Sequence, residues 1–192
     1  MDIKQVLLEQ ISGAAADKLG SRNGLDGEQT TSAVDSALTA ILSGLQGEAG
    51  NKKQAEKLDA ALKKDHDGSI LNDLVGAVGN DSTKLDGGKI LEHIFGSNGG
   101  KVTDSVAKNS GVSSSAAGDI LQTLAPIVLG QLGKQKQSEG FDAGGLISIL
   151  LNQKSGKGDG GLGDIVSGMF NKKNASIFAL LLGLFKLFMR KK

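Results

Sequence analysis

The sequence predicts an all-α protein: a compact multi-helix bundle of two related helical halves, followed by a C-terminal hydrophobic helix. Three observations support this fold class. Aromatic residues make up only 3% of the 192 residues, without Trp or Tyr, so the aromatic cross-strand pairs that stabilise sheets are scarce. Apolar residues recur at helical spacing along most of the chain. The 29 glycines and the single proline suit many short helices joined by tight turns.

Three helices are expected before residue 65. Residues 2–19 read as one amphipathic helix, which ends in a turn from Gly20 to Gly24. Asp26 and Gln29 have the spacing of a capping box and predict the start of a long apolar helix. Residues 51–64 are charged with a narrow apolar seam, which is typical of a surface helix.

At the turn Asp65–Ser69 the pattern changes from charged to apolar. Short helices are predicted over residues 70–78 and 84–95. The serines at 113–115 offer N-cap oxygens for the most apolar helix of the bundle, which Pro126 should kink because proline removes one backbone hydrogen bond.

Composition divides the chain into three parts. Residues 1–153 are predicted to form the duplicated helical domain, including a helix at 146–151. Residues 154–163 are rich in Gly and Lys and predict a flexible linker. Residues 164–192 are predicted to hold a short helix and the apolar, basic C-terminal helix.

An internal repeat indicates the two halves. Residues 19–46 align without gaps onto residues 106–133, which places Gly24 on Gly111 and Leu45 on Leu132. Apolar periodicity alone could produce such a match by chance. The shared turn glycine, the capping residues and the long apolar helix favour duplication, and a ligand would then lie between the halves.

Charge and cysteine content exclude several classes. The net charge is +1, but every charged residue after Asp164 is basic, so the remainder of the chain is acidic. A nucleic-acid-binding face is therefore not expected. The absence of Cys excludes disulfides and thiolate metal sites, and the N-terminal residues do not resemble a signal peptide. We expect a cytoplasmic protein, with a peripheral location at the inner membrane as a variant of this expectation.

Three separate segments carry a family resemblance. They are Asp65–Leu74 (DHDGSILNDL), Lys89–Gly96 (KILEHIFG) and Leu124–Gly130 (LAPIVLG). Together and in this order, they resemble the bacterial family called domain of unknown function 937, over roughly residues 1–150. The resemblance implies a compact, all-α bacterial protein and carries over no reaction.

The turn Asp65–Ser69 is the densest cluster of ligand-type side chains. Asp65, His66 and Asp67 could bind Zn²⁺ or Mn²⁺, with His93 as a further ligand. The structural alternative is that Asp67 or Ser69 caps the following helix and that His93 hydrogen-bonds to the turn. We favour this alternative because caps are common and no fourth ligand is evident. We therefore predict no metal site and expect Zn²⁺ to leave the melting temperature unchanged.

The sequence contains little that points to an enzyme. No nucleophile elbow, Walker A loop or dinucleotide-binding fingerprint is present. Residues that are neighbours in sequence, such as His66 and Ser69, seldom form a catalytic triad. We predict no catalytic residue and no cofactor.

The C-terminal segment from Asn174 to Met189 is almost entirely apolar, and such a helix cannot stay exposed to water. It could lie in a membrane interface, or it could dock on a protein partner or a second copy of this chain. The leading hypothesis is thus a non-catalytic structural or interaction protein, and the alternative is a small metal- or ligand-binding protein centred on Asp65, His66 and Asp67. The predicted contact residues of the tail are Ile177, Phe178, Leu181, Leu184, Phe185 and Phe188.

Overall fold

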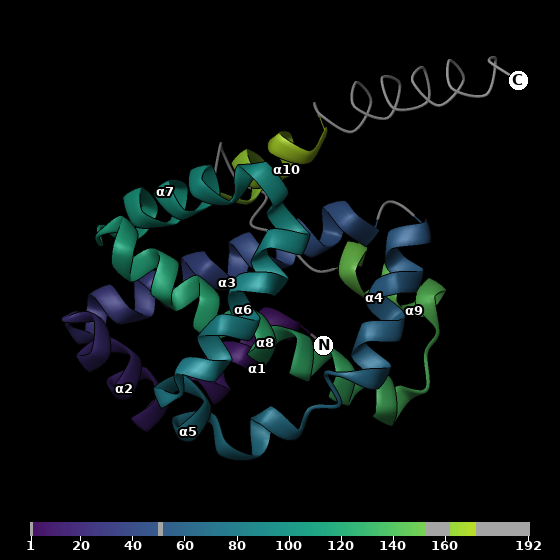
Figure 1. Ribbon diagram of the computed structural model, residues 1–192, viewed down its shortest axis with the longest axis horizontal. Coiled ribbons are helices and arrows are strands. Elements are labelled where there is room, and N and C mark those ends of the chain that lie inside the picture. Colours follow the sequence, from purple (N-terminus) through teal and green to yellow (C-terminus); the bar gives the residue numbers. More distant parts are fainter. Residues whose placement is uncertain (1, 50–51, 153–161, 172–192) are drawn as a thin grey trace, which may run out of the picture.

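The computed structural model describes residues 2–49, 52–152 and 162–171, and within these ranges it contains helices and no strands (Figure 1). The predicted all-α class is confirmed. The helices are, in chain order, α1 (Ile3–Gln10), α2 (Ala14–Asn23), α3 (Gly27–Ala49), α4 (Lys52–Lys64), the 3-10 helix η1 (Ser69–Asp73), α5 (Leu74–Gly79), α6 (Asp81–Phe95), the 3-10 helix η2 (Gly96–Asn98), α7 (Gly99–Ser110), α8 (Ser114–Glu139), α9 (Ala143–Asn152) and α10 (Leu162–Asn171).

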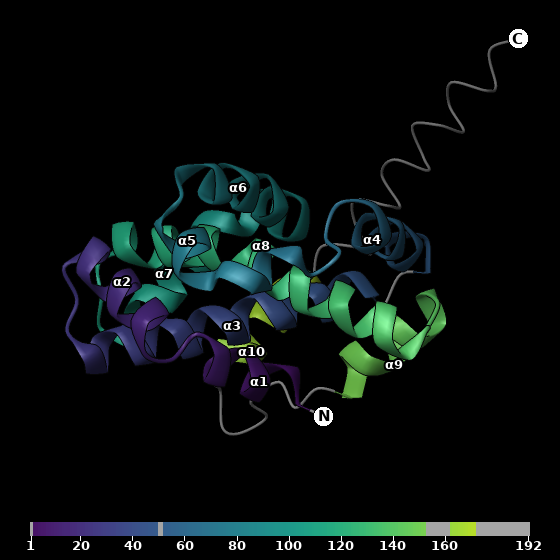
Figure 2. The same ribbon diagram turned by 90° about the horizontal axis from the view of Figure 1, so that it is seen from below.

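Two long helices, α3 and α8, form the centre of the molecule. Both are buried on nearly every face, α3 from Thr30 to Leu45 and α8 from Ala116 to Gln135. A helix that is apolar all round must be covered by other helices. Figure 2 shows α4, α5 and α6 on one side of this pair and α1 and α10 on the other. α10 packs against α3 and α7, and its Leu162 and Val166 lie in the same hydrophobic core.

The predicted caps of the two central helices are confirmed. Asp26 and Gln29 form the capping box of α3. The backbone N–H of Gln29 donates to Asp26 Oδ1 at 2.8 Å, and the backbone N–H of Asp26 donates to Gln29 Oε1 at 3.3 Å. The Ser113 hydroxyl accepts a hydrogen bond from the Ala116 amide at 3.1 Å and caps α8. Each cap satisfies an amide that the first turn of the helix leaves without a partner.

The same glycine turn precedes both central helices. Gly24 and Gly111 each end a helix in the left-handed conformation, with φ of 66° and 69°. The amide of the next residue then donates back to a carbonyl of the ending helix, from Leu25 to Gly20 at 2.9 Å and from Val112 to Ala107 at 3.1 Å. This is the hydrogen bond of a Schellman motif.

The predicted single helix over residues 2–19 is wrong, because it is two helices. α1 ends at Gln10, and α2 begins after Gly13, whose φ of 63° is open only to glycine at low cost. The apolar side chains of Ile3, Leu7, Ile11 and Ala15 are all buried across the break, so the periodicity of the sequence does not reveal it.

The predicted helix over residues 70–78 is also divided. Residues Ser69–Asp73 form η1, and α5 starts anew at Leu74. Asp73 lies outside helical dihedrals and its Oδ1 accepts a hydrogen bond from the Gly76 amide at 2.8 Å. Asp73 is therefore the N-cap that the pattern did not predict.

The helix α8 runs from Ser114 to Glu139 and continues through Pro126.

A polar cluster ties α2 to α6 and α8. Asp119 of α8 accepts a hydrogen bond from Asn23 at 3.2 Å and forms ion pairs with Lys84 and Arg22. The Arg22 guanidinium also donates to the Val78 carbonyl at 3.0 Å. Asp119 is only 15% exposed, so these partners compensate the cost of burying its charge.

Among the described residues no single helix has the length and apolarity of a membrane span, although residues Asp81–Ser110 and Ser114–Glu139, joined at a bend of 109°, meet these criteria as a pair.

Close backbone contact fixes the crossing of α6 over α8. A Cβ placed on Gly87 would lie 1.7 Å from the Gln122 carbonyl oxygen, whereas one placed on the next residue, Gly88, would meet nothing within 4 Å. Gly87 therefore lets the two helices touch, and Gly88 has no such role.

We expect Gly87→Ala to lower the free energy of unfolding by about 3 kcal/mol, because α6 must move away from α8. The matched variant Gly88→Ala should raise it by about 0.5–1 kcal/mol, since alanine restricts the unfolded chain more than glycine does. Urea unfolding followed by circular dichroism measures both. Similar effects of the two substitutions would show that the helix crossing does not depend on Gly87.

Candidate functional site

The turn Asp65–Ser69 is held by hydrogen bonds of its own residues. Asp67 Oδ1 accepts from the Ser69 amide at 2.9 Å, and Gly68 has a φ of 92°. The prediction that Asp67 or Ser69 caps the following helix is wrong: the N-cap residue of η1 is Gly68, without a side-chain cap hydrogen bond, and α5 is capped by Asp73. The hydrogen bond from Ser69 stabilises the carboxylate and lowers the pKa of Asp67.

The backbone of this turn rests directly on α8. A Cβ on Gly133 would lie 1.6 Å from the His66 carbonyl oxygen, and one on Gly130 would lie 2.5 Å from Ile70 Cγ2. The side chain of Gln137 also donates to the Asp67 carbonyl at 3.0 Å. The turn is thus docked on two glycines of α8.

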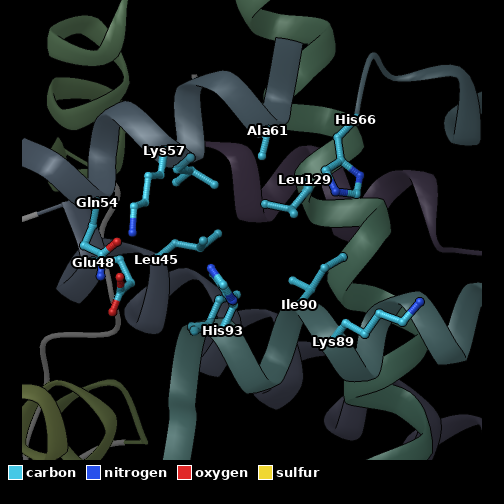
Figure 3. Close-up of a pocket in the computed structure, with 12 residues that line it drawn as sticks. Leu45, Glu48, Gln54, Lys57, Ala61, His66, Lys89, Ile90, His93 and Leu129 are labelled. Atoms are coloured by element: carbon cyan, nitrogen blue, oxygen red, sulfur yellow. The ribbon is translucent and has the colours of Figure 1, made fainter. Parts of the chain in front are cut away.

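The two histidines line one cavity from different elements. His66 follows the end of α4, and His93 lies in the last turn of α6 (Figure 3). The sequence analysis predicted a hydrogen bond between His93 and the turn Asp65–Ser69. In the part of the chain that the structure describes, His93 makes no such bond, so this prediction is wrong. The turn is hydrogen-bonded to α8 instead. The sequence analysis expected His66 and His93 to lie near each other, but it did not predict the cavity that both of them line.

The metal candidates do not converge in the described residues. No group of three or more His, Asp or Glu side chains there has an arrangement that could hold a metal ion. Asp65, His66 and Asp67 share a small polar hollow with Asp86, while His93 lies in the larger cavity on the other side of His66.

The larger cavity has a volume of about 230 Å³ and lies between α4 and α6. Its floor comes from the central helices and its walls from α4 and α6. The apolar lining residues are Leu45, Leu58, Ala61, Ile90, Ile94 and Leu129. The polar lining residues are Glu48, Gln54, Lys57, His66, Lys89 and His93. We call this cavity the α4–α6 cleft.

The polar groups of the cleft are separated along its length. Figure 3 shows Glu48, Gln54 and Lys57 at one end, His66 at the other, and Leu45, Ile90 and Leu129 between them. The side chains of Lys57 and His93 point into the cavity from opposite walls, while that of Lys89 extends away from it. The middle of the cleft is thus apolar, with hydrogen-bonding groups at each end.

Burial shifts two ionisable groups of the cleft. Partial burial raises the pKa of Glu48, and electrostatic interactions with His93 and Lys57 oppose this effect. Burial lowers the pKa of His66, against the attraction of Asp65, Asp86 and Asp67. Burial therefore favours the uncharged form of the His66 ring, which borders the cavity.

Sequence reasoning missed most of this site. From the sequence, Lys57 belongs to the charged surface helix predicted over residues 51–64, Ile90 and Leu129 belong to predicted apolar helices, and Glu48 has no predicted role. Only a structure shows that these four side chains border one cavity. The available signal was the narrow apolar seam of α4, which leaves Leu58 and Ala61 only partly covered.

Residues 5–135 match the model of the family described as bacterial protein of unknown function (DUF937). The chain belongs to this family. The match covers the turn Asp65–Ser69, the cleft and the part of α8 on which the turn rests, and it confirms the resemblance carried by the three sequence motifs. No curated protein and no solved structure matches the chain.

The predicted interaction residues of the tail, Ile177 to Phe188, lie outside the described residues. The same holds for the predicted linker, apart from its final residues 162 and 163.

Glu48 gives a test of the electrostatics of the cleft. Because its folded-state pKa is raised, the folded protein loses stability as the pH rises through that pKa. Glu48→Gln should therefore raise the free energy of unfolding at pH 7, by on the order of 0.5 kcal/mol because the exposed half of the carboxylate is screened. The gain should shrink towards pH 4, where the carboxyl is protonated in both states.

Thermal denaturation between pH 4 and pH 8 measures this effect. Glu56→Gln is the matched control, since Glu56 is exposed on α4 and does not line the cleft. A destabilised Glu48→Gln protein at pH 7 would mean that the attraction of Lys57 and His93 outweighs the cost of burial.

Proposed function

We propose that this bacterial helical protein is a non-catalytic binding protein and that the α4–α6 cleft receives a small, largely apolar ligand. The observation that carries this proposal is a cavity of about 230 Å³ over an otherwise packed core, with an apolar middle and polar ends. Ligand pockets of proteins have this character: mainly apolar walls and a few polar groups that fix orientation. The sequence analysis gave ligand binding at Asp65, His66 and Asp67 as the alternative function. The ligand site proposed here is instead the cavity beside that turn.

The lining of the cleft supports binding over catalysis. It contains no Ser, Thr, Cys or Tyr that could act as a nucleophile next to either histidine. Neither histidine has a carboxylate hydrogen-bonded to its ring among the described residues, so no group orients it as a general base.

We also propose that the bundle arose by duplication. The alignment of residues 19–46 with 106–133 places the cap Asp26 on Ser113 and its donor Gln29 on Ala116. It also places Asn23, which donates to the Leu19 carbonyl, on Ser110, which donates to the Val106 carbonyl. Side-chain hydrogen bonds that agree position by position support common ancestry more strongly than apolar periodicity does.

A fluorescent apolar probe tests the proposed cleft. We expect 1-anilinonaphthalene-8-sulfonate or N-phenyl-1-naphthylamine to bind with micromolar affinity and enhanced emission, with one aromatic ring in the cleft and the rest of the molecule projecting from its open side. Ala61→Phe should weaken this binding at least tenfold, because the added ring fills the apolar middle of the cleft. Ala60→Phe is the matched control, since Ala60 is exposed on the same helix. Equal binding by both variants would place the probe elsewhere.

The tail supplies a second candidate function, as an interaction protein. The described body exposes few large hydrophobic side chains, namely Val75, Leu85 and Ile165. The apolar and basic segment 174–192 is thus the strongest candidate for contact with a protein partner, a second copy or the inner-membrane surface. The cytoplasm, with peripheral contact at the inner membrane, is the location we propose.

Removal of residues 172–192 tests this second function. We expect the truncated protein to lose oligomerisation or membrane recovery while it keeps the thermal stability of the body. Sedimentation velocity and flotation with anionic vesicles are the measurements. An unchanged oligomeric state together with unchanged membrane recovery would reject the role of the tail.

A further inference from the structure

The size and the end groups of the α4–α6 cleft restrict the ligand further. At about 30 Å³ for each water-sized unit, 230 Å³ holds roughly eight non-hydrogen atoms. A nucleotide or a long lipid chain would therefore extend out of the cleft. It suits a molecule with a chain of five or six carbons and one small headgroup.

The headgroup should lie at the Lys57 end of the cleft. Lys57 and His93 both point into the cavity there, and both act electrostatically on one half-buried carboxylate, Glu48. A ligand cation would meet the positive charge of Lys57. A ligand anion would gain a charged hydrogen bond from Lys57 and a second donor from His93.

The opposite end should receive the ligand's apolar terminus. Ile90, Leu129 and Ala61 line the path towards His66. The ring of His66 closes this end, and an uncharged imidazole is compatible with a methyl terminus. The acidic residues of the turn lie beyond the ring, in a separate hollow.

We propose that the α4–α6 cleft binds a medium-chain monocarboxylate of about six carbons, with its carboxylate between Lys57 and His93 and its chain over Ile90 and Leu129. This inference rests on the proposed function and adds the charge and length of the ligand. Glu48 then competes with the bound carboxylate for Lys57, which makes its side chain a determinant of affinity.

The first test compares headgroups on one chain. Hexanoate, hexanol and hexylamine are titrated into the full-length protein by calorimetry, with displacement of the neutral probe N-phenyl-1-naphthylamine as a second readout. We expect hexanoate to bind about tenfold more tightly than hexanol and hexylamine to bind most weakly. From butanoate to hexanoate the affinity should rise about fourfold per methylene, and it should stop rising beyond octanoate.

The second test uses variants of the charged end. Lys57→Met keeps most of the aliphatic stem and should reduce hexanoate affinity about tenfold while leaving hexanol unchanged. Lys63→Met is the matched control, since Lys63 lies on the same helix outside the cleft. Glu48→Gln should increase hexanoate affinity, because it removes the competing carboxylate.

The outcomes separate this inference from the proposed function. If hexanol or hexylamine binds as tightly as hexanoate, or if Lys57→Met leaves hexanoate binding intact, the carboxylate assignment is overturned and the apolar cleft remains. If neither the three hexyl compounds nor the neutral probe bind, both the assignment and the proposed function fail.

Discussion

The close approach of backbones on α8 is the constraint on which the rest of the structure depends. Gly87 lets α6 cross α8 at van der Waals distance, and Gly133 lets the turn after α4 rest on the same helix. The contact between α8 and α6 fixes one wall of the cleft. The contact between α8 and the turn fixes the other wall, formed by α4, at its His66 end. Because both contacts are made by main-chain atoms, they set positions more rigidly than side-chain packing does.

The cleft follows from this arrangement. α4 and α6 are each anchored to the central helices, and the space between them is bordered by Lys57 on one side and His93 on the other. Glu48, at the end of α3, brings a carboxylate to the same place at some cost in burial. An anionic ligand at this end would compete with Glu48 for Lys57.

Local chemistry was readable from the sequence, and distant contacts were not. Asp26, Gln29 and Ser113 act within one helical turn, so their spacing was enough to predict the caps. Gly13 interrupts a helix without interrupting its buried face, so periodicity predicted one helix in place of two. Glu48, Lys57 and Leu129 come together only through the crossing of helices far apart in the chain, which spacing along one helix cannot reveal.

The repeated glycine turn has a consequence for the order of folding. Each turn closes a helical hairpin, α2 with α3 and α7 with α8, through hydrogen bonds between residues close in sequence. Contacts of this kind form early because little chain entropy is lost. The hydrogen bonds between hairpins, from Asn109 to Ser36 and from Asn23 to Asp119, require both hairpins to be present. We therefore expect the two hairpins to form before the polar contacts between them.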